Sequence, residues 1–192
     1  MAKATGTPRI RKSVKLRVST VSSMASVPGR LNGLAAQQRD DVLDGEQHDQ
    51  RTGNHVTGMT PKALEGIQRW DTATLVQALK QNERPVIIDA AAFGPVIPGA
   101  LNFVHSGLAF EDAQQDFAYA ERFRHILLAA APNLNQAVVF YCASSECWLS
   151  VNAAMRARQL GYTQVIWYRG GINAWVKAGL PTVGRAPVAV LY

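Results

Sequence analysis

The chain of 192 residues is 47% hydrophobic and carries a formal net charge of +6 at pH 7, which suits one compact domain with an extension and is short for two domains. The excess charge comes from residues 1–33, which hold seven basic residues and no acidic one, whereas residues 34–192 hold 13 basic and 14 acidic residues. This distribution argues against a basic nucleic-acid-binding face on the folded part, and no apolar stretch approaches the length of a transmembrane helix.

Residues 1–60 are expected to form a disordered or loosely attached tail, and residues 61–192 to form the domain. The tail is rich in Gly, Ser, Gln, Asp and Arg and has no sustained hydrophobic period. The tail lacks the apolar core of a secretory signal. Its Arg- and Ser-rich composition is compatible with an organellar transit peptide, or with a start codon assigned too far upstream. Two cysteines do not make a disulfide framework, so the redox compartment stays open.

Strands and helices alternate from Trp70 onward. The expected elements, in chain order, are a helix over 73–80 with Asp71 or Thr72 as its N-cap, a strand over 86–89, a short strand within 100–104, a helix over 111–131 with Phe117, Phe123 and Leu127 at compatible spacing, a strand over 137–141, a helix over 148–160, a strand over 164–168 and a short helix containing Trp175. This alternation predicts an α/β fold with a mostly parallel central sheet and helices on both faces.

Cys142 is the residue that points most directly to chemistry. It follows the apolar strand 137–141 and precedes a short polar loop that leads into a helix. In an open α/β sheet, ligands bind at the carboxyl ends of the strands, and free N–H groups at a helix start stabilise a thiolate and bind anions. The structural alternative is a buried packing cysteine, since free cysteine is among the most buried residue types.

Five segments in order resemble the rhodanese family over roughly residues 70–183. They are residues 86–89, 97–102, 138–142, 150–162 and 170–181, and the last is very close to the C-terminal rhodanese signature. The Cys-Trp pair at 147–148 resembles, more narrowly, the rhodanese-like proteins with a Cys–gap–Cys-Trp motif that are associated with PQQ-dependent alcohol catabolism. The resemblance implies a rhodanese-like three-layer domain.

The same resemblance implies a sulfurtransferase or sulfane-sulfur carrier that uses Cys142 as its persulfide-forming nucleophile. A small sulfur donor would load Cys142, and a thiol or cyanide would accept the sulfur, while loop N–H groups hold the terminal sulfur anion. The implied substrate-binding loop comprises Ala143, Ser144, Ser145, Glu146, Cys147 and Trp148. Asp89 is expected to anchor the loop after its strand, a structural role near the site. No metal site and no cofactor are expected.

Several residues depart from the family pattern. Leu149 stands where an arginine commonly closes the loop, Ala91 replaces a common arginine, and Val96 replaces a common histidine. No residue from 143 to 149 is cationic, and Glu146 has the wrong sign for attracting thiosulfate. Arg169 could supply the missing positive charge, or it could be a solvated turn residue. These departures argue against efficient thiosulfate turnover.

Cys147 offers a second chemistry beside Cys142. The two cysteines are within loop-closing reach, so they could form a disulfide, or Cys147 could resolve a sulfenate or a persulfide on Cys142. Their five-residue spacing is not that of a Cys-x-x-Cys motif and does not support a thioredoxin-like activity. Alternatively, Cys147 is a small packing residue at the helix start.

Three hypotheses therefore stay open. The chain is a Cys142-dependent sulfur-handling enzyme, a catalytically degenerate rhodanese domain that binds or matures a partner, or a Cys142–Cys147 redox switch. The resemblance suggests a quinoprotein dehydrogenase system as partner and the periplasm as compartment, with the cytoplasm as the alternative. Neither nucleic acid nor a membrane is expected as a partner.

Overall fold

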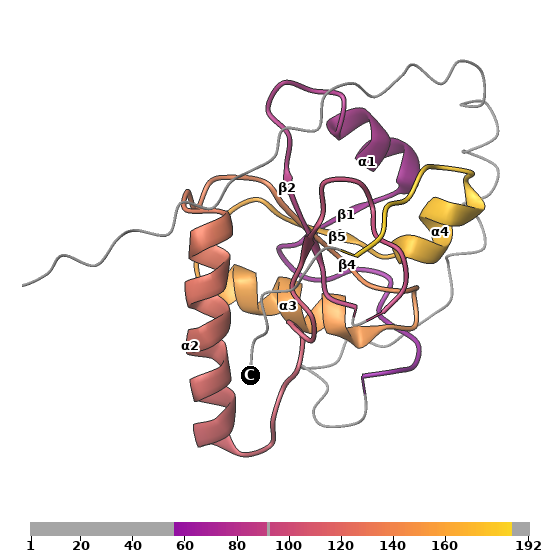
Figure 1. Ribbon diagram of the computed structural model, residues 1–192. Coiled ribbons are helices and arrows are strands. Elements are labelled where there is room, and N and C mark those ends of the chain that lie inside the picture. Colours follow the sequence, from indigo (N-terminus) through magenta and orange to yellow (C-terminus); the bar gives the residue numbers. More distant parts are fainter. Residues whose placement is uncertain (1–55, 92, 186–192) are drawn as a thin grey trace, which may run out of the picture.

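The computed structural model describes residues 56–91 and 93–185, and it contains a five-stranded sheet in the order β1-β5-β4-β2-β3 (Figure 1). All pairings between these strands are parallel. The strands are β1 (Gln68–Trp70), β2 (Val86–Asp89), β3 (Leu101–Asn102), β4 (Val138–Tyr141) and β5 (Val165–Tyr168). The helices are α1 (Thr72–Ala78), α2 (Ala113–Ala130), α3 (Trp148–Gln159) and α4 (Gly171–Lys177).

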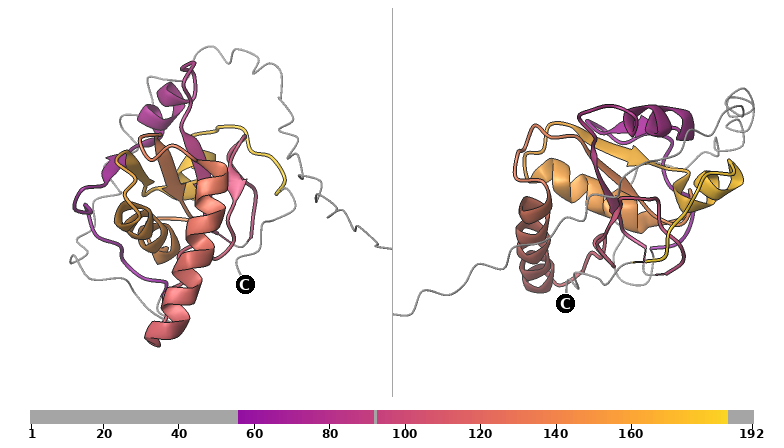
Figure 2. Two further views of the ribbon diagram at one scale, coloured as in Figure 1. Left: turned by 90° about the vertical axis from the view of Figure 1, so that its left-hand side faces the viewer. Right: turned by 45° about the horizontal axis from the view of Figure 1, so that its top comes forward.

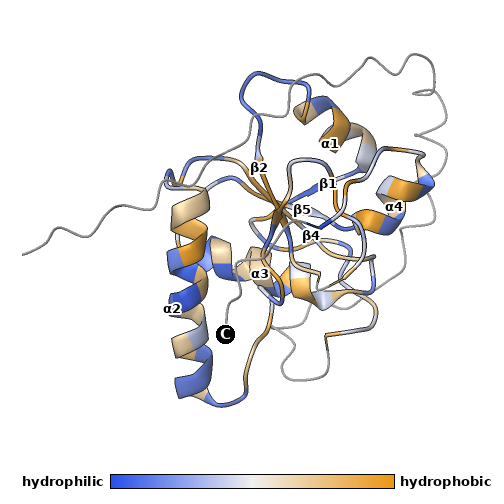
Figure 3. Cartoon of the chain, in the orientation of Figure 1, coloured by the Kyte–Doolittle hydropathy of each residue, from blue (hydrophilic) through white to orange (hydrophobic). Residues whose placement is uncertain are grey.

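The sheet lies between two layers of helices, with α2 and α3 on one face and α1 and α4 on the other (Figures 1 and 2). Side chains of a strand alternate between its faces. In β4, Val138 and Phe140 pack with α2 and α3, whereas Val139 and Tyr141 pack with α1 and α4. Both faces of β4 are therefore buried, and the inner strands are strongly hydrophobic (Figure 3). The expected α/β fold with a parallel sheet and helices on both faces is confirmed.

The long helix α2 packs on the sheet through Phe123 and Leu127, as expected, but not through Phe117. Its buried side chains are Tyr119, Phe123 and Leu127, which are spaced four residues apart. Phe117, which was expected to share that face, is 69% exposed. A four-residue step keeps side chains on one stripe of a helix, whereas the step from 117 to 123 turns away from it. The interpretation of Phe117 is therefore wrong.

An ion pair ties α2 to α3. The guanidinium of Arg156 donates to both carboxylate oxygens of Asp116, and it also donates to the carbonyl of Leu108 at 3.1 Å. Burial raises the pKa of Asp116, but hydrogen bonds from Arg156 and from the N–H of Phe110 outweigh it and hold that pKa below its ordinary value. The pair therefore fixes the helix that follows the cysteine loop against its neighbour.

The described part of the chain holds neither a helix long and apolar enough to cross a membrane nor a cluster of side chains arranged to bind a metal ion. Residues 1–55 of the expected tail lie outside the described residues. Residues 56–60, which were also placed in the tail, pack against the cysteine loop: Thr60 is fully buried and Val56 contacts the cluster around Cys142. The packed part of the molecule therefore begins no later than Val56.

Candidate active site

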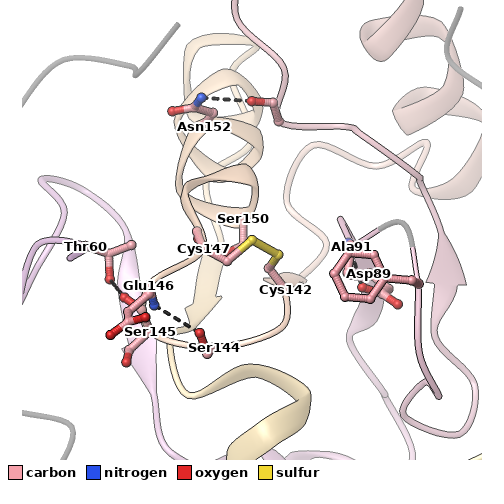
Figure 4. Close-up of a disulfide and its surroundings, with 12 residues drawn as sticks. Thr60, Asp89, Ala91, Cys142, Ser144, Ser145, Glu146, Cys147, Ser150 and Asn152 are labelled. Atoms are coloured by element: carbon pink, nitrogen blue, oxygen red, sulfur yellow. Dashed lines mark hydrogen bonds between the residues drawn. A yellow bond between two sulfur atoms is a disulfide. The ribbon is translucent and has the colours of Figure 1, made fainter. Parts of the chain in front are cut away.

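Cys142 lies at the carboxyl end of β4, and it forms a disulfide with Cys147, the N-cap residue of α3 (Figure 4). The two Cα atoms are 6.1 Å apart, which falls within the usual range for a disulfide. Cys142 is only 2% exposed, while Cys147 is half-buried. The sequence predicted an exposed thiol at Cys142, but in this oxidised form its sulfur is buried. The disulfide between Cys142 and Cys147 is one of the alternatives that their five-residue spacing left open.

The start of α4 holds the first half of the loop. The N–H of Ile172 donates to the carbonyl of Cys142 at 2.9 Å, and the N–H of Asn173 donates to that of Ala143 at 3.0 Å. Gly171 makes this approach feasible, because its φ is +61° and a Cβ there would lie 2.3 Å from the carbonyl oxygen of Cys142. Only glycine adopts this conformation readily and leaves the space. The Gly-Gly turn before α4 therefore positions the cysteine backbone.

Residues 56–60, named here the N-terminal strap, hold the second half of the loop. In the strap, Thr57 forms an isolated antiparallel bridge with Cys147. The hydrogen bonds between strap and loop are Trp148 N to Val56 O at 2.7 Å, Gly58 N to Glu146 O at 2.8 Å, Thr60 N to Ser145 O at 3.2 Å and the Trp148 indole N–H to Met59 O at 3.0 Å. The strap thus covers the loop from the side opposite Asp89 (Figure 4).

Arg169 supports the strap. Its Nε donates to the hydroxyl of Thr60 and to the carbonyl of Pro61, each at 3.1 Å, and its Nη2 donates to the carbonyl of Thr60 at 3.1 Å. Its guanidinium also lies 5.9 Å from the centre of the Trp167 ring. Arg169 is 3% exposed, so the alternative of a solvated turn residue is wrong. Its guanidinium is linked to the loop by hydrogen bonds through Thr60, whose hydroxyl donates to the carbonyl of Ser145.

Asp89, at the end of β2, anchors the segment that follows its strand. Its Oδ1 accepts the N–H of Ala91 at 2.8 Å, and its Oδ2 forms an ion pair with Arg185 at 2.8 Å. Burial raises the pKa of Asp89 to about 6, although the Ala91 N–H and the Arg185 guanidinium act to lower it. Ala91 packs against Cys142, so this carboxyl lies next to the wall of the site.

Arg185 is a residue that the sequence did not single out. Its Nη1 donates to the carbonyl of Ala91 at 2.9 Å and to Asn102 Oδ1 at 3.2 Å. A pair of backbone hydrogen bonds between Val96 and Val183, each of 3.0 Å, brings this end of the described chain to the carboxyl edge of the sheet. An isolated arginine after the last predicted helix carries no local motif, so only the folded chain places its cation here.

The loop itself offers backbone donors and no cation. Residues 143–149 contain no lysine or arginine. Among the described residues, the N–H groups of Ala143, Ser144 and Ser145 have no hydrogen-bond partner. The Ser144 hydroxyl accepts the N–H of Glu146 at 3.2 Å, and Glu146 itself is exposed. Consecutive backbone N–H groups with no partner can hold an anion beside a strand-end sulfur.

The remaining wall of the site is apolar. Leu149, at the position where an arginine was expected, packs with Cys142, Ala90 and Ala91. Gly107 lies directly on the first turn of α3, because a Cβ there would fall 1.7 Å from the carbonyl oxygen of Leu149. Trp148 is fully buried in a cluster with Leu64, Val151 and Trp167, and it therefore belongs to the core more than to a substrate surface.

The fold and the site together define the class of protein. It is an α/β domain that carries a cysteine loop at the carboxyl ends of the strands of a parallel sheet. Residues 72–178, more than half of the chain, match the family model of the rhodanese-like domain. The chain belongs to the rhodanese-like domain family. No curated protein sequence matches it significantly.

Three solved structures illustrate how the fold compares. Thiosulfate sulfurtransferase from Pseudomonas aeruginosa is 18% identical, with a TM-score of 0.44 over 65% of this chain and 21% of that one. An uncharacterized protein from Saccharomyces cerevisiae is 22% identical, with a TM-score of 0.43 over 59% and 93%. The polysulfide-sulfur transferase homodimer from Wolinella succinogenes is 16% identical, with a TM-score of 0.43 over 63% and 81%. The chain spans about a fifth of the first of these proteins.

Proposed function

We propose that the chain is a sulfurtransferase or sulfane-sulfur carrier in which Cys142 is the persulfide-forming nucleophile. The observation that carries this proposal is the position of Cys142 in a rhodanese-like domain, at the end of β4 and beside three loop N–H groups with no partner. A terminal persulfide sulfur is an anion, and backbone donors can hold it without a cationic side chain. A small sulfur donor would load Cys142, and a thiol or cyanide would unload it.

The finer parts of the proposal rest on the sequence resemblance around the Cys-Trp pair at 147–148 and the residues that follow it. They are an association with PQQ-dependent alcohol oxidation, a quinoprotein dehydrogenase system as partner, and a periplasmic location. A Cys142–Cys147 disulfide is compatible with an oxidising compartment. A transient catalytic disulfide is equally compatible with the cytoplasm, which remains the alternative.

Two further functions are supported by particular observations. The absence of a cation from residues 143–149 and the exposed Glu146 favour a domain that binds or matures a partner and does not turn over thiosulfate. The disulfide itself favours a redox switch. Uptake of sulfur by Cys142 separates the first proposal from both.

The test is the intact mass of the reduced full-length chain before and after addition of thiosulfate or a polysulfide. Gain of one sulfur atom that is absent from Cys142→Ser supports the proposal, because this variant lacks the thiol that the proposal loads and keeps Cys147. Circular dichroism of Cys142→Ser verifies that the variant is folded. If neither the wild type nor Cys147→Ser gains sulfur from either donor, or if Cys142→Ser gains as much as they do, the proposal fails.

A further inference from the structure

The backbone holds both cysteines near each other without help from the disulfide. On one side, α4 binds the carbonyls of Cys142 and Ala143. On the other side, the strap binds Glu146 and Trp148 and forms the bridge to Cys147. Reduction of the disulfide therefore leaves two thiols whose main-chain positions are still fixed from outside the loop. Holding two reacting groups in place in this way gives a high effective molarity.

We infer that Cys147 resolves the persulfide of Cys142 and releases its sulfane sulfur as sulfide, an inference that rests on the proposed function. The Cys147 thiolate attacks Sγ of Cys142, the Cys142–Cys147 bond forms, and the bond between Sγ and the outer sulfur breaks. The proton that Cys147 gives up on becoming a thiolate passes to the outer sulfur of the persulfide anion. The outer sulfur therefore leaves with the electron pair as hydrosulfide, which takes a second proton from water to become hydrogen sulfide. The outer sulfur is reduced by two electrons, and the two cysteines are oxidised to the disulfide.

The structure favours attack on the inner sulfur over transfer of the outer one. The atom bonded to Cys147 in the disulfide is Sγ of Cys142, which is the inner sulfur of a Cys142 persulfide. Hydrosulfide is a better leaving group than a cysteine thiolate, because its conjugate acid is the stronger acid. Residues 143–149 provide no cation that would retain the departing anion. The loop is therefore built to release sulfide once Cys147 has attacked.

A thiol reductant closes the cycle. Cys142 is 2% exposed and Cys147 is half-buried, so the reductant reaches Cys147 first and expels the Cys142 thiolate. A second thiol group then releases Cys147 and completes a disulfide in the reductant. Each turn takes one sulfane sulfur from the donor, oxidises two thiol groups of the reductant and yields one hydrogen sulfide. A dithiol suits this step, because both thiol groups belong to one molecule.

The experiment is a single turnover of the reduced full-length chain without oxygen or added thiol. One equivalent of thiosulfate or a polysulfide is added, and intact mass and trapped sulfide are measured together. The wild type is expected to lose two hydrogen atoms and to release one sulfide per chain. Cys147→Ser is expected to keep one extra sulfur atom and to release at least tenfold less sulfide. Phe117→Ala, a substitution at an exposed position of α2 outside the site, is expected to behave like the wild type.

The remaining outcomes distinguish failure of this inference from failure of the proposed function. If the wild type keeps the extra sulfur on Cys142 as Cys147→Ser does, or if peptide mapping finds the sulfur on Cys147, the inference is overturned and sulfur uptake by the chain stands. A disulfide that forms without an equivalent of sulfide also overturns it. If Cys147→Ser takes up no sulfur from either donor, the proposed function fails as well.

Discussion

At the scale of single residues, a buried carboxyl beside the cysteine loop depends on an arginine from the far end of the described chain. Asp89 is 1% exposed, and its ion-pair partner Arg185 lies 96 positions away in the sequence. Burial outweighs the ion pair and the Ala91 N–H, so the pKa of Asp89 rises to about 6. A buried carboxylate is costly when it is ionised, and a nearby guanidinium offsets only part of that cost.

We expect the free energy of unfolding to fall as the pH rises from about 4 to about 6. In this range the folded chain holds a proton on Asp89 that the unfolded chain has lost, because the folded pKa is about 6 and the unfolded value is 3.8. The loss amounts to about 2–3 kcal/mol. Urea unfolding at several pH values measures it, and Asp89→Asn is the control, since it should remove this part of the slope.

The companion variant is Arg185→Gln. Loss of the guanidinium should raise the pKa of Asp89 above its present value, and the pH range in which stability falls should extend upward with it. A carboxyl titration followed by NMR reports the shift directly. An unchanged pKa in Arg185→Gln would contradict the role given to this ion pair.

At the scale of elements, the turn into α4 determines where the cysteine backbone lies. Gly171→Ala is expected to destabilise the fold by about 2 kcal/mol or more, because alanine disfavours a positive φ and its Cβ meets the carbonyl of Cys142 at 2.3 Å. The loop should shift, and sulfur uptake by Cys142 should slow. Chemical unfolding measures the first effect, and the rate of mass gain in the Cys147→Ser background, where the sulfur stays on Cys142, measures the second.

Gly179 provides a matched control for this prediction. Its φ is +69°, close to that of Gly171, but a Cβ there would meet nothing within 4 Å. Gly179→Ala therefore carries the conformational cost without the collision, and we expect about 1 kcal/mol and no change in sulfur uptake. Equal effects of the two substitutions would show that the approach of α4 to the loop is unimportant.

The elements that the sequence predicts well are those with a strong local pattern. The apolar runs that became β2, β4 and β5 are buried on both faces, and Asp71 caps α1 through its side chain, as its position suggested. β1 was missed because it is a three-residue edge strand with two exposed residues, so it has no apolar run. β3 is shorter than expected for a similar reason, since one of its two residues is exposed.

Within the site, local signals predicted the cysteines and long-range contacts supplied their surroundings. Cys142 could be placed because a buried strand ends directly before it, and its reach to Cys147 followed from their spacing. The strap, Arg185 and the buried position of Arg169 depend on contacts between residues 80 or more positions apart. No periodicity or motif within a short window encodes such contacts, so the sequence left them open.

At the scale of the whole molecule, the disulfide adds stability without being needed for the fold. The ring that it closes spans only six residues, 142–147, so its entropic contribution is about 2 kcal/mol in the chain-entropy account. We expect reduction to lower the free energy of unfolding by that amount while the near-ultraviolet circular dichroism stays native. A chain with both cysteines changed to serine should be insensitive to reductant, and a reduced chain that unfolds would contradict this account.

The strap has a consequence for anything attached to the chain before it. Because the carbonyl of Val56 accepts the N–H of the first residue of α3, a protein fused at residue 56 would be tethered at the rim of the cysteine loop. Through a short flexible linker, a fused thiol donor or acceptor would meet the loop at an effective concentration in the millimolar range. Its encounter with Cys147 would then be independent of dilution, a property that an attachment point on the opposite edge of the sheet would not confer.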